Sequence, residues 1–201
     1  MQVGFHYFSI PNPVIMCKVT SMLLALLLSL SAGAQGVFVN QTNTALKMVI
    51  EDYPNHFSNI KGETINTPEP AVKYKSKVII PGSVNCVLTE SKTTAAYSWK
   101  CELFSSSDFQ NAKDRFNSLY KEIHNTIIKL AGEKPSILNG QYEEPDKNRR
   151  QNVIHFHFLP NTGIIQKLHV ELQLQSEGSE WKIMLQVYEV PAESGNMQTM
   201  A

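Results

Sequence analysis

Apolar and polar residues repeat along this chain with two different periods, and the longer period predicts one amphipathic helix. From Ser107 to Leu130, apolar side chains recur every three or four residues, which places them on one face of an α-helix. Ser107 or Asp108 can cap its first turn, and Gly132 followed by Pro135 is expected to end it. The apolar stripe consists of Phe109, Ala112, Phe116, Leu119, Tyr120, Ile123, Ile127 and Leu130.

A second helix and two irregular stretches are predicted on either side of the long helix. Thr44–Tyr53 has the same helical spacing, and Pro54 would end it. Glu63–Ala71 contains two prolines and two threonines, so it is expected to be a surface connector. Residues 132–151 combine turn-forming residues with charges of both signs, which predicts a long, solvated loop.

Two stretches between these helices are predicted to be the strands of a hairpin. Ala96–Phe104 alternates strictly between apolar and polar residues, as a half-buried strand does. Tyr74–Glu90 is extended in character but contains Pro81 and Gly82. This pair marks a bulge, a bend or an edge within the strand.

The two cysteines of this hairpin predict its register. If Cys86 faces Cys101, Leu88 faces Trp99 and the apolar side chains of both strands point to the same side. The hydrophobic pattern and the cysteine pairing therefore agree, and we expect a Cys86–Cys101 disulfide. A redox-active pair is not favoured, because the Cys-x-x-Cys spacing that lowers a thiol pKa is missing.

The last patterned region, Asn152–Val190, predicts a three-stranded antiparallel meander with one apolar and one polar face. Three alternating runs are separated by a turn at residues 160–163 and by a two-residue turn at Glu177 and Gly178. The predicted class is α+β: a two-layer domain over residues 35–190, with an antiparallel sheet of about five strands (the hairpin plus the meander) packed against two helices. Residues 191–201 are expected to form a flexible C-terminal tail.

The N-terminal segment predicts export to the periplasm or out of the cell. Lys18 precedes an apolar run from Met22 to Leu30, and Ala32-Gly33-Ala34 fits a signal-peptidase site, so residues 1–34 are predicted to be a signal peptide cleaved after Ala34. The run is about half of the ~20 residues that span a bilayer, so no stable membrane anchor is expected after cleavage. Three methionines are compatible with the translation start: Met1, Met16 and Met22. The signal resembles those of bacterial envelope or secreted proteins.

The amino-acid composition argues against nucleic-acid binding and for a folded protein with one disulfide. Lys and Arg number 18, equal to Asp and Glu, so the chain lacks the basic excess of a dedicated nucleic-acid binder. Hydrophobic residues make up 42% of the chain, as in a folded globular protein. Two cysteines remain after signal cleavage, which fits one disulfide in an exported protein.

One group of polar residues is the candidate site. Matching the apolar faces of the meander places His155 opposite Glu171 and His157 opposite His169, with Met184 beside Glu171. The three histidines and the glutamate could lie within about 5–8 Å of one another on the polar face. Imidazole and carboxylate groups suit Zn²⁺, or Cu²⁺ in a nitrogen-rich site. The alternative is that they are ordinary polar residues on the solvated face of a one-sided sheet.

No catalytic motif is present: the chain has no phosphate-binding glycine loop, no Gly-x-Ser-x-Gly and no His-Glu-x-x-His. The favoured hypothesis is therefore a non-enzymatic exported binding module, without a cofactor, whose partner is a protein or a glycan. The competing hypothesis is a zinc-binding protein or metal-dependent hydrolase that uses His155, His157, His169 and Glu171.

Overall fold

The computed structural model describes residues 41–65, 70–94 and 96–190, and within them nine strands form one antiparallel sheet with two α-helices. The helices are α2 (Gln41–Glu51) and α3 (Phe109–Ile123). The strands are β1 (Lys61–Ile65), β2 (Ala71–Ser76), β3 (Asn85–Ser91), β4 (Tyr97–Ser106), β5 (Ile127–Ile128), β6 (Ser136–Gly140), β7 (Gln151–Leu159), β8 (Leu168–Glu177) and β9 (Glu180–Glu189). The α+β class is confirmed, whereas the prediction of about five strands is wrong.

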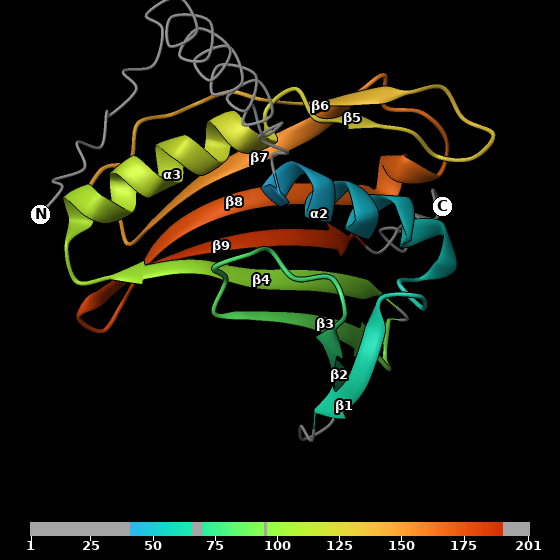
Figure 1. Cartoon of the computed structure of the whole chain (residues 1–201), viewed down its shortest axis with the longest axis horizontal. Coiled ribbons are helices and arrows are strands. Elements are labelled where there is room, and N and C mark those ends of the chain that lie inside the picture. The colour runs from blue at the N-terminus through green and yellow to red at the C-terminus, as the bar shows by residue number, and fades with distance from the viewer. Residues whose placement is uncertain (1–40, 66–69, 95, 191–201) are drawn as a thin grey trace, which may run out of the picture. The chain divides into compact units, whose positions relative to one another are not determined.

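The sheet consists of two meanders that are each continuous in sequence, β1–β4 and β5–β9. Their last strands, β4 and β9, pair with each other, so the order across the sheet is β1-β2-β3-β4-β9-β8-β7-β6-β5 (Figure 1). Every other adjacent pair in this sheet joins strands that follow each other along the chain. The helix α3 connects the two meanders.

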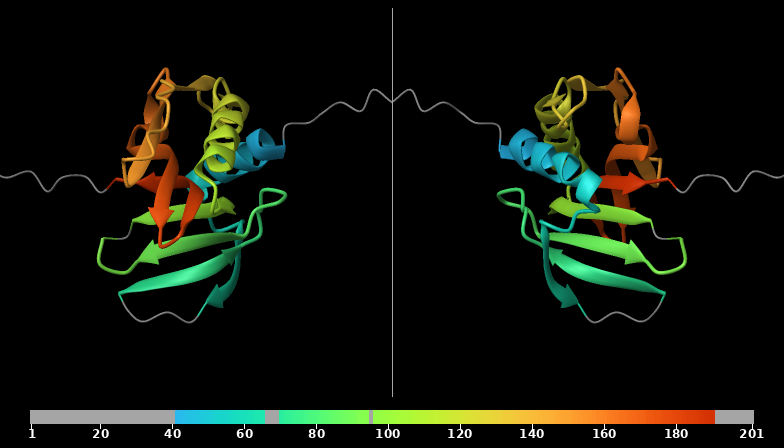
Figure 2. Two further views of the ribbon diagram at one scale, coloured as in Figure 1. Left: turned by 90° about the vertical axis from the view of Figure 1, so that its left-hand side faces the viewer. Right: turned by 90° about the vertical axis from the view of Figure 1, so that its right-hand side faces the viewer.

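Both helices lie on the same face of the sheet, which we call the inner face. The sheet bends, so that β1–β4 run below the helices while β7 and β8 rise beside them (Figure 2). The core between these layers contains fully buried side chains from helices and strands, including Leu46, Trp99, Phe116, Leu119 and Phe158. Each such side chain contributes about 1.5–3 kcal/mol of hydrophobic stabilisation.

The helix α3 is shorter than its periodicity predicted. Asp108 is its N-cap, because its carboxylate accepts a hydrogen bond from Gln110 N–H (2.8 Å). The helix stops at Ile123, and Asn125 then adopts a φ of +65°, which an α-helix cannot continue. Of the predicted stripe beyond Ile123, Ile127 is exposed (58%) in β5, and Leu130 is buried but lies outside any helix or strand.

The five-strand prediction missed three short strands and merged two others. β1 overlaps the predicted connector, β5 lies in the predicted long helix, and β6 lies in the predicted loop at residues 132–151. The predicted strand Tyr74–Glu90 is in fact β2 and β3, joined by a loop at residues 77–84. Each missed strand has five residues or fewer, which is too short for alternation to be distinctive.

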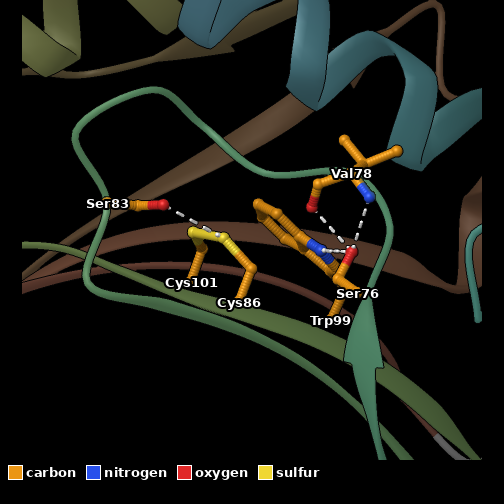
Figure 3. Close-up of a disulfide and its surroundings, with 6 residues drawn as sticks. All are labelled: Ser76, Val78, Ser83, Cys86, Trp99 and Cys101. Carbon is orange, nitrogen blue, oxygen red and sulfur yellow. Dashed lines mark hydrogen bonds between the residues drawn. A yellow bond between two sulfur atoms is a disulfide. The ribbon is translucent and has the colours of Figure 1, made fainter. Parts of the chain in front are cut away.

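The predicted register of the β3–β4 hairpin is confirmed. Cys86 pairs with Cys101 and Leu88 pairs with Trp99, and the two cysteines form a disulfide. The loop at residues 77–84 passes over this disulfide on the inner face (Figure 3). It is fastened there by Ser76, whose hydroxyl accepts a hydrogen bond from Trp99 Nε1–H (3.0 Å) and donates one to Val78 C=O (2.7 Å).

The predicted signal peptide, residues 1–34, and the predicted tail, residues 191–201, lie outside the described residues. Among the helices of the described part, none is long and apolar enough to cross a membrane.

Candidate functional site

The predicted site residues lie on the face of the sheet opposite the helices, which we call the outer face. His155 on β7 pairs directly with Glu171 on β8, as the matching of the apolar faces predicted. His157 lies farther along β7 and pairs with Asn139 of β6, while His169 lies near the start of β8. The structure therefore brings His155 and Glu171 together as the centre of the candidate site.

Glu171 is almost buried although it belongs to the outer face: its side chain is 10% exposed. The Tyr188 hydroxyl donates a hydrogen bond to Oε1 (2.5 Å), and Gln173 Nε2 donates one to Oε2 (2.7 Å). His155 Nδ1 lies 3.1 Å from Oε1. A buried carboxylate requires hydrogen-bond donors for its oxygens, and both oxygens of Glu171 have one.

Glu171 lies on the Nδ1 side of the His155 ring, at ion-pair distance. Nε2 is on the opposite side of the imidazole, and the His155 side chain is 59% exposed. The ring is therefore accessible from the surface while one of its edges faces the carboxylate.

Tyr188 completes the contact on the β9 side. Its burial, and then its hydrogen bond to the negatively charged Glu171, raise the pKa of the phenol to about 12. Its ring stacks on His169, with 5.5 Å between the ring centroids. Tyr188 therefore remains a neutral hydrogen-bond donor throughout the ordinary pH range and holds Glu171 in place.

The predicted pairing of β8 with β9 is wrong by two positions. Gln186, and not Met184, lies opposite Glu171. The turn is formed by Gly178 and Ser179, one residue later than predicted, and Gly178 adopts the positive φ (+63°) that a tight hairpin turn requires. Moving the turn by one residue shifts each pair by two, so the outer face keeps the same set of side chains.

The four predicted metal ligands do not form one cluster. The β7–β8 ladder ends at the pair Phe156–Val170, before His157 and His169 can become neighbours within it. In the described segments, no group of three or more His, Cys, Asp or Glu side chains is placed to hold a metal ion. One imidazole and one carboxylate in contact do not supply the three or four protein ligands of a zinc site.

A hollow of about 670 Å³ lies beside His155, where β6 departs from β7. The histidines His155 and His157 are on its wall, and the ion pair Arg149–Glu143 lies at the end near the start of β7. Its lining residues are Asn139, Gly140, Gln141, Tyr142, Glu143, Val153, Ile154, His155, His157 and Leu159. Six of these ten residues have polar side chains, although more of the lining surface is apolar than polar, and no serine, threonine or cysteine is among them.

The backbone of β7 presents unpaired groups to this hollow. β6 pairs with β7 as far as Gly140, although β7 begins at Gln151. Ser176 N–H donates a hydrogen bond to Arg150 C=O (2.9 Å), so the N–H and C=O groups of Arg150 point toward β8. Along an antiparallel strand, the N–H and C=O groups of successive residues point to opposite sides. The N–H and C=O groups of Gln151 and Val153 therefore point away from β8, and no described residue pairs with them there.

Two residues of the site were missed in the sequence, Tyr188 and Gln173. The alternating pattern placed both residues on the polar face. The signal that could have identified them was a glutamate, Glu171, between long side chains on that face. The hollow could not be predicted, because it depends on the course of residues 141–146 between β6 and β7.

Comparison with known proteins finds no match: no family model, no curated protein and no solved structure resembles this chain.

Proposed function

We propose that this chain is an exported, non-enzymatic binding module that captures an extended peptide along the free edge of β7. The observation that carries the proposal is the hollow of about 670 Å³ beside the unpaired backbone of Gln151 and Val153. A peptide that adds as a strand gains main-chain hydrogen bonds, while alternate side chains enter neighbouring pockets. Such an edge favours a peptide over a glycan, which has no repeating N–H and C=O pattern.

The position of His155 supports the same function. His155 lies beside Glu171 with its side chain 59% exposed, so its imidazole can form a hydrogen bond with a polar side chain of the peptide. The wall of the hollow offers no serine, threonine or cysteine nucleophile for His155 to activate, and this favours binding over hydrolysis.

Export is the second part of the proposal. It is supported by the signal-like pattern ending at Ala34 and by the disulfide Cys86–Cys101, since disulfides persist in oxidising compartments. Expression of the full chain in a bacterial host, followed by fractionation and N-terminal sequencing, tests it. We expect the periplasmic product to begin at Gln35; an unprocessed cytoplasmic product would contradict export.

Hydrogen exchange of the full chain tests the free edge without any ligand. Amides on the β8 side of β7, those of Asn152 and Ile154, are expected to exchange slowly. Those of Gln151 and Val153 should exchange orders of magnitude faster, because no residue of the described chain accepts a hydrogen bond from them. Uniform protection along β7 would show that this edge is closed.

Peptide capture is tested with a phage-displayed random peptide library. Peptides selected on the wild type should protect the amides of Gln151 and Val153 and should lose most of their affinity for Val153→Pro, which removes one edge-facing N–H. Val153→Ala is the matched control, because it keeps that N–H. Equal binding to Val153→Pro, with its folding verified by thermal unfolding, would overturn the proposal, as would enrichment on a glycan array with no selected peptide.

A further inference from the structure

A second hollow, of about 340 Å³, lies on the outer face over the other half of the sheet. It spans β1 to β4 and reaches β9, so it is separate from the hollow beside β7 and takes no part in the proposed peptide binding. Its lining residues are Ile65, Lys73, Asn85, Val87, Thr89, Lys100, Glu102 and Met184. Its volume is within the range of small-molecule sites.

The floor of this hollow is apolar, in contrast to the surrounding face. Met184 is 8% exposed although it lies at an outer-face position between Glu102 of β4 and Gln173 of β8. Val87 on β3 and Ile65 on β1, two and four strands away from Met184, are half-buried parts of the same lining. Apolar side chains distributed along a hollow can take an extended apolar chain out of water.

Two lysines of this lining, Lys73 and Lys100, form no ion pair within the described residues, although the charge of Lys100 contributes, after that of Lys182, to lowering the pKa of Glu177. Other lysines on the same face form ion pairs, for example Lys75 with Glu63 (3.0 Å) and Lys182 with Glu177 (2.9 Å). Lys73 and Lys100, by contrast, have no ion-pair partner in residues 41–65, 70–94 and 96–190.

The single carboxylate of the lining does not neutralise both lysines. Glu102 pairs across the sheet with Met184, and after the hydrogen bond from Lys182 to Glu177 its charge also raises the pKa of Lys182 on β9. The hollow therefore has one more positive than negative charge. Lys73 and Lys100 lie on β2 and β4, which are two strand spacings or about 10 Å apart, and they are offset by two residues along the strands, since Lys73 pairs with Thr89 and Lys100 with Val87. Their four-carbon side chains can both reach one anion between them.

We propose that this hollow binds a small amphipathic monoanion, a carboxylate with an unbranched apolar chain. The carboxylate lies between the ammonium groups of Lys73 and Lys100, and the chain covers Met184 and Val87. Charge complementarity selects the head group, and the apolar floor selects the chain. A small ligand is favoured over a protein partner because the hollow is concave and lined by few residues.

The probe for this proposal is decanoate, with decanol as its neutral counterpart. Titration of the full chain labelled with ¹³C at the methionine methyl groups reports on the floor directly, and Met184→Leu assigns the relevant signal. We expect decanoate to shift the Met184 signal and decanol to bind at least tenfold more weakly, since hydrogen bonds to charged groups are the stronger class. Added salt should weaken decanoate binding.

Lys73→Gln/Lys100→Gln is expected to lower the affinity for decanoate by about tenfold or more. Lys129→Gln/Lys134→Gln is the matched control, because it removes two exposed lysines elsewhere and changes the net charge equally. Equal affinities in both double variants, equal affinities for decanol and decanoate, or no shift at Met184 would each overturn the proposal. All three outcomes leave the peptide experiment on β7 unaffected.

Discussion

At the scale of single residues, the contact between Tyr188 and Glu171 gives the protein a pH dependence in alkali. The pKa of Tyr188 is raised to about 12 by burial and by Glu171, and that of Tyr53 is raised to about 12 by burial and by Glu189. An unfolded tyrosine titrates near pH 10. The stability that depends on the protonated phenols is therefore complete below pH 10 and is lost as the pH rises from 10 to 12.

Titration of the near-ultraviolet tyrosinate absorbance measures this effect. We expect two phenols of the folded protein to ionise near pH 12, and one of these to disappear in Tyr188→Phe. In guanidinium chloride all tyrosines should ionise near pH 10. If folded Tyr188→Phe and the wild type show the same change in absorbance near pH 12, the Tyr188–Glu171 contact is absent.

At the scale of elements, Asp52 organises the turn that follows α2. The carboxylate is buried and accepts hydrogen bonds from the backbone N–H groups of Asn59 (3.1 Å) and Ile60 (3.2 Å) and from the side chain of Asn55 (3.0 Å). His56, inside this turn, has a positive φ (+53°), an uncommon conformation for a residue other than glycine. The hydrogen bonds to Asp52 offset that strain.

Asp52→Asn is therefore expected to lower the free energy of unfolding by about 1–3 kcal/mol, because an amide NH₂ would face N–H groups that need an acceptor. Chemical denaturation measures the loss. The matched control is Asp114→Asn on the solvent-exposed side of α3, which should change stability by less than about 0.5 kcal/mol. A similar loss in both variants would contradict the role of Asp52.

The elements differed in how far the sequence could predict them. The meander was predicted because β7, β8 and β9 each have nine or ten residues of alternation. β6, with five residues, contains Asn139 and Gly140, a pair that favours turns, so its alternation was overlooked. The turn between β8 and β9 was misplaced by one residue because Glu177-Gly178 and Gly178-Ser179 are similar turn sequences.

At the scale of the whole molecule, the disulfide joins β3 and β4, the last two strands of the first meander. The loop closed by Cys86 and Cys101 has a sequence separation of 15, for which the chain-entropy model gives about 3 kcal/mol. We expect Cys86→Ala/Cys101→Ala to lose roughly that free energy of unfolding, measured by denaturation in urea.

Reduction provides the control for this prediction. A reductant should lower the stability of the wild type and leave the double variant unchanged. It should act slowly on the native protein, because both cysteines are buried beneath the loop at residues 77–84. Rapid reduction under native conditions would contradict this burial.

The sequence pattern predicted the strand pairing at the candidate site but not the burial of Glu171 or the hollow beside it. Cross-strand matching placed His155 beside Glu171 because register follows from the apolar faces. The burial of Glu171 depends on the side chains of β7 and β9 around it, and the hollow depends on where β6 departs from β7. Both are properties of the assembled sheet and leave no local periodicity in the sequence.

The pairing of β4 with β9 has a consequence for how the chain can be divided. Cys101 meets Leu185 across this junction, whereas all other pairings in the described sheet are between successive strands. Loop closure makes such a distant pairing the slowest to form. A chain cut between Ser106 and Asp108 should therefore give two fragments, one with α2 and β1–β4 and one with α3 and β5–β9, that reassemble when mixed. Because α2 packs against α3 and β5, the two fragments meet in the helical layer as well as along β4 and β9. Recovery of native near-ultraviolet circular dichroism from the mixture, and from neither fragment alone, would show that neither half of the molecule completes its fold without the other.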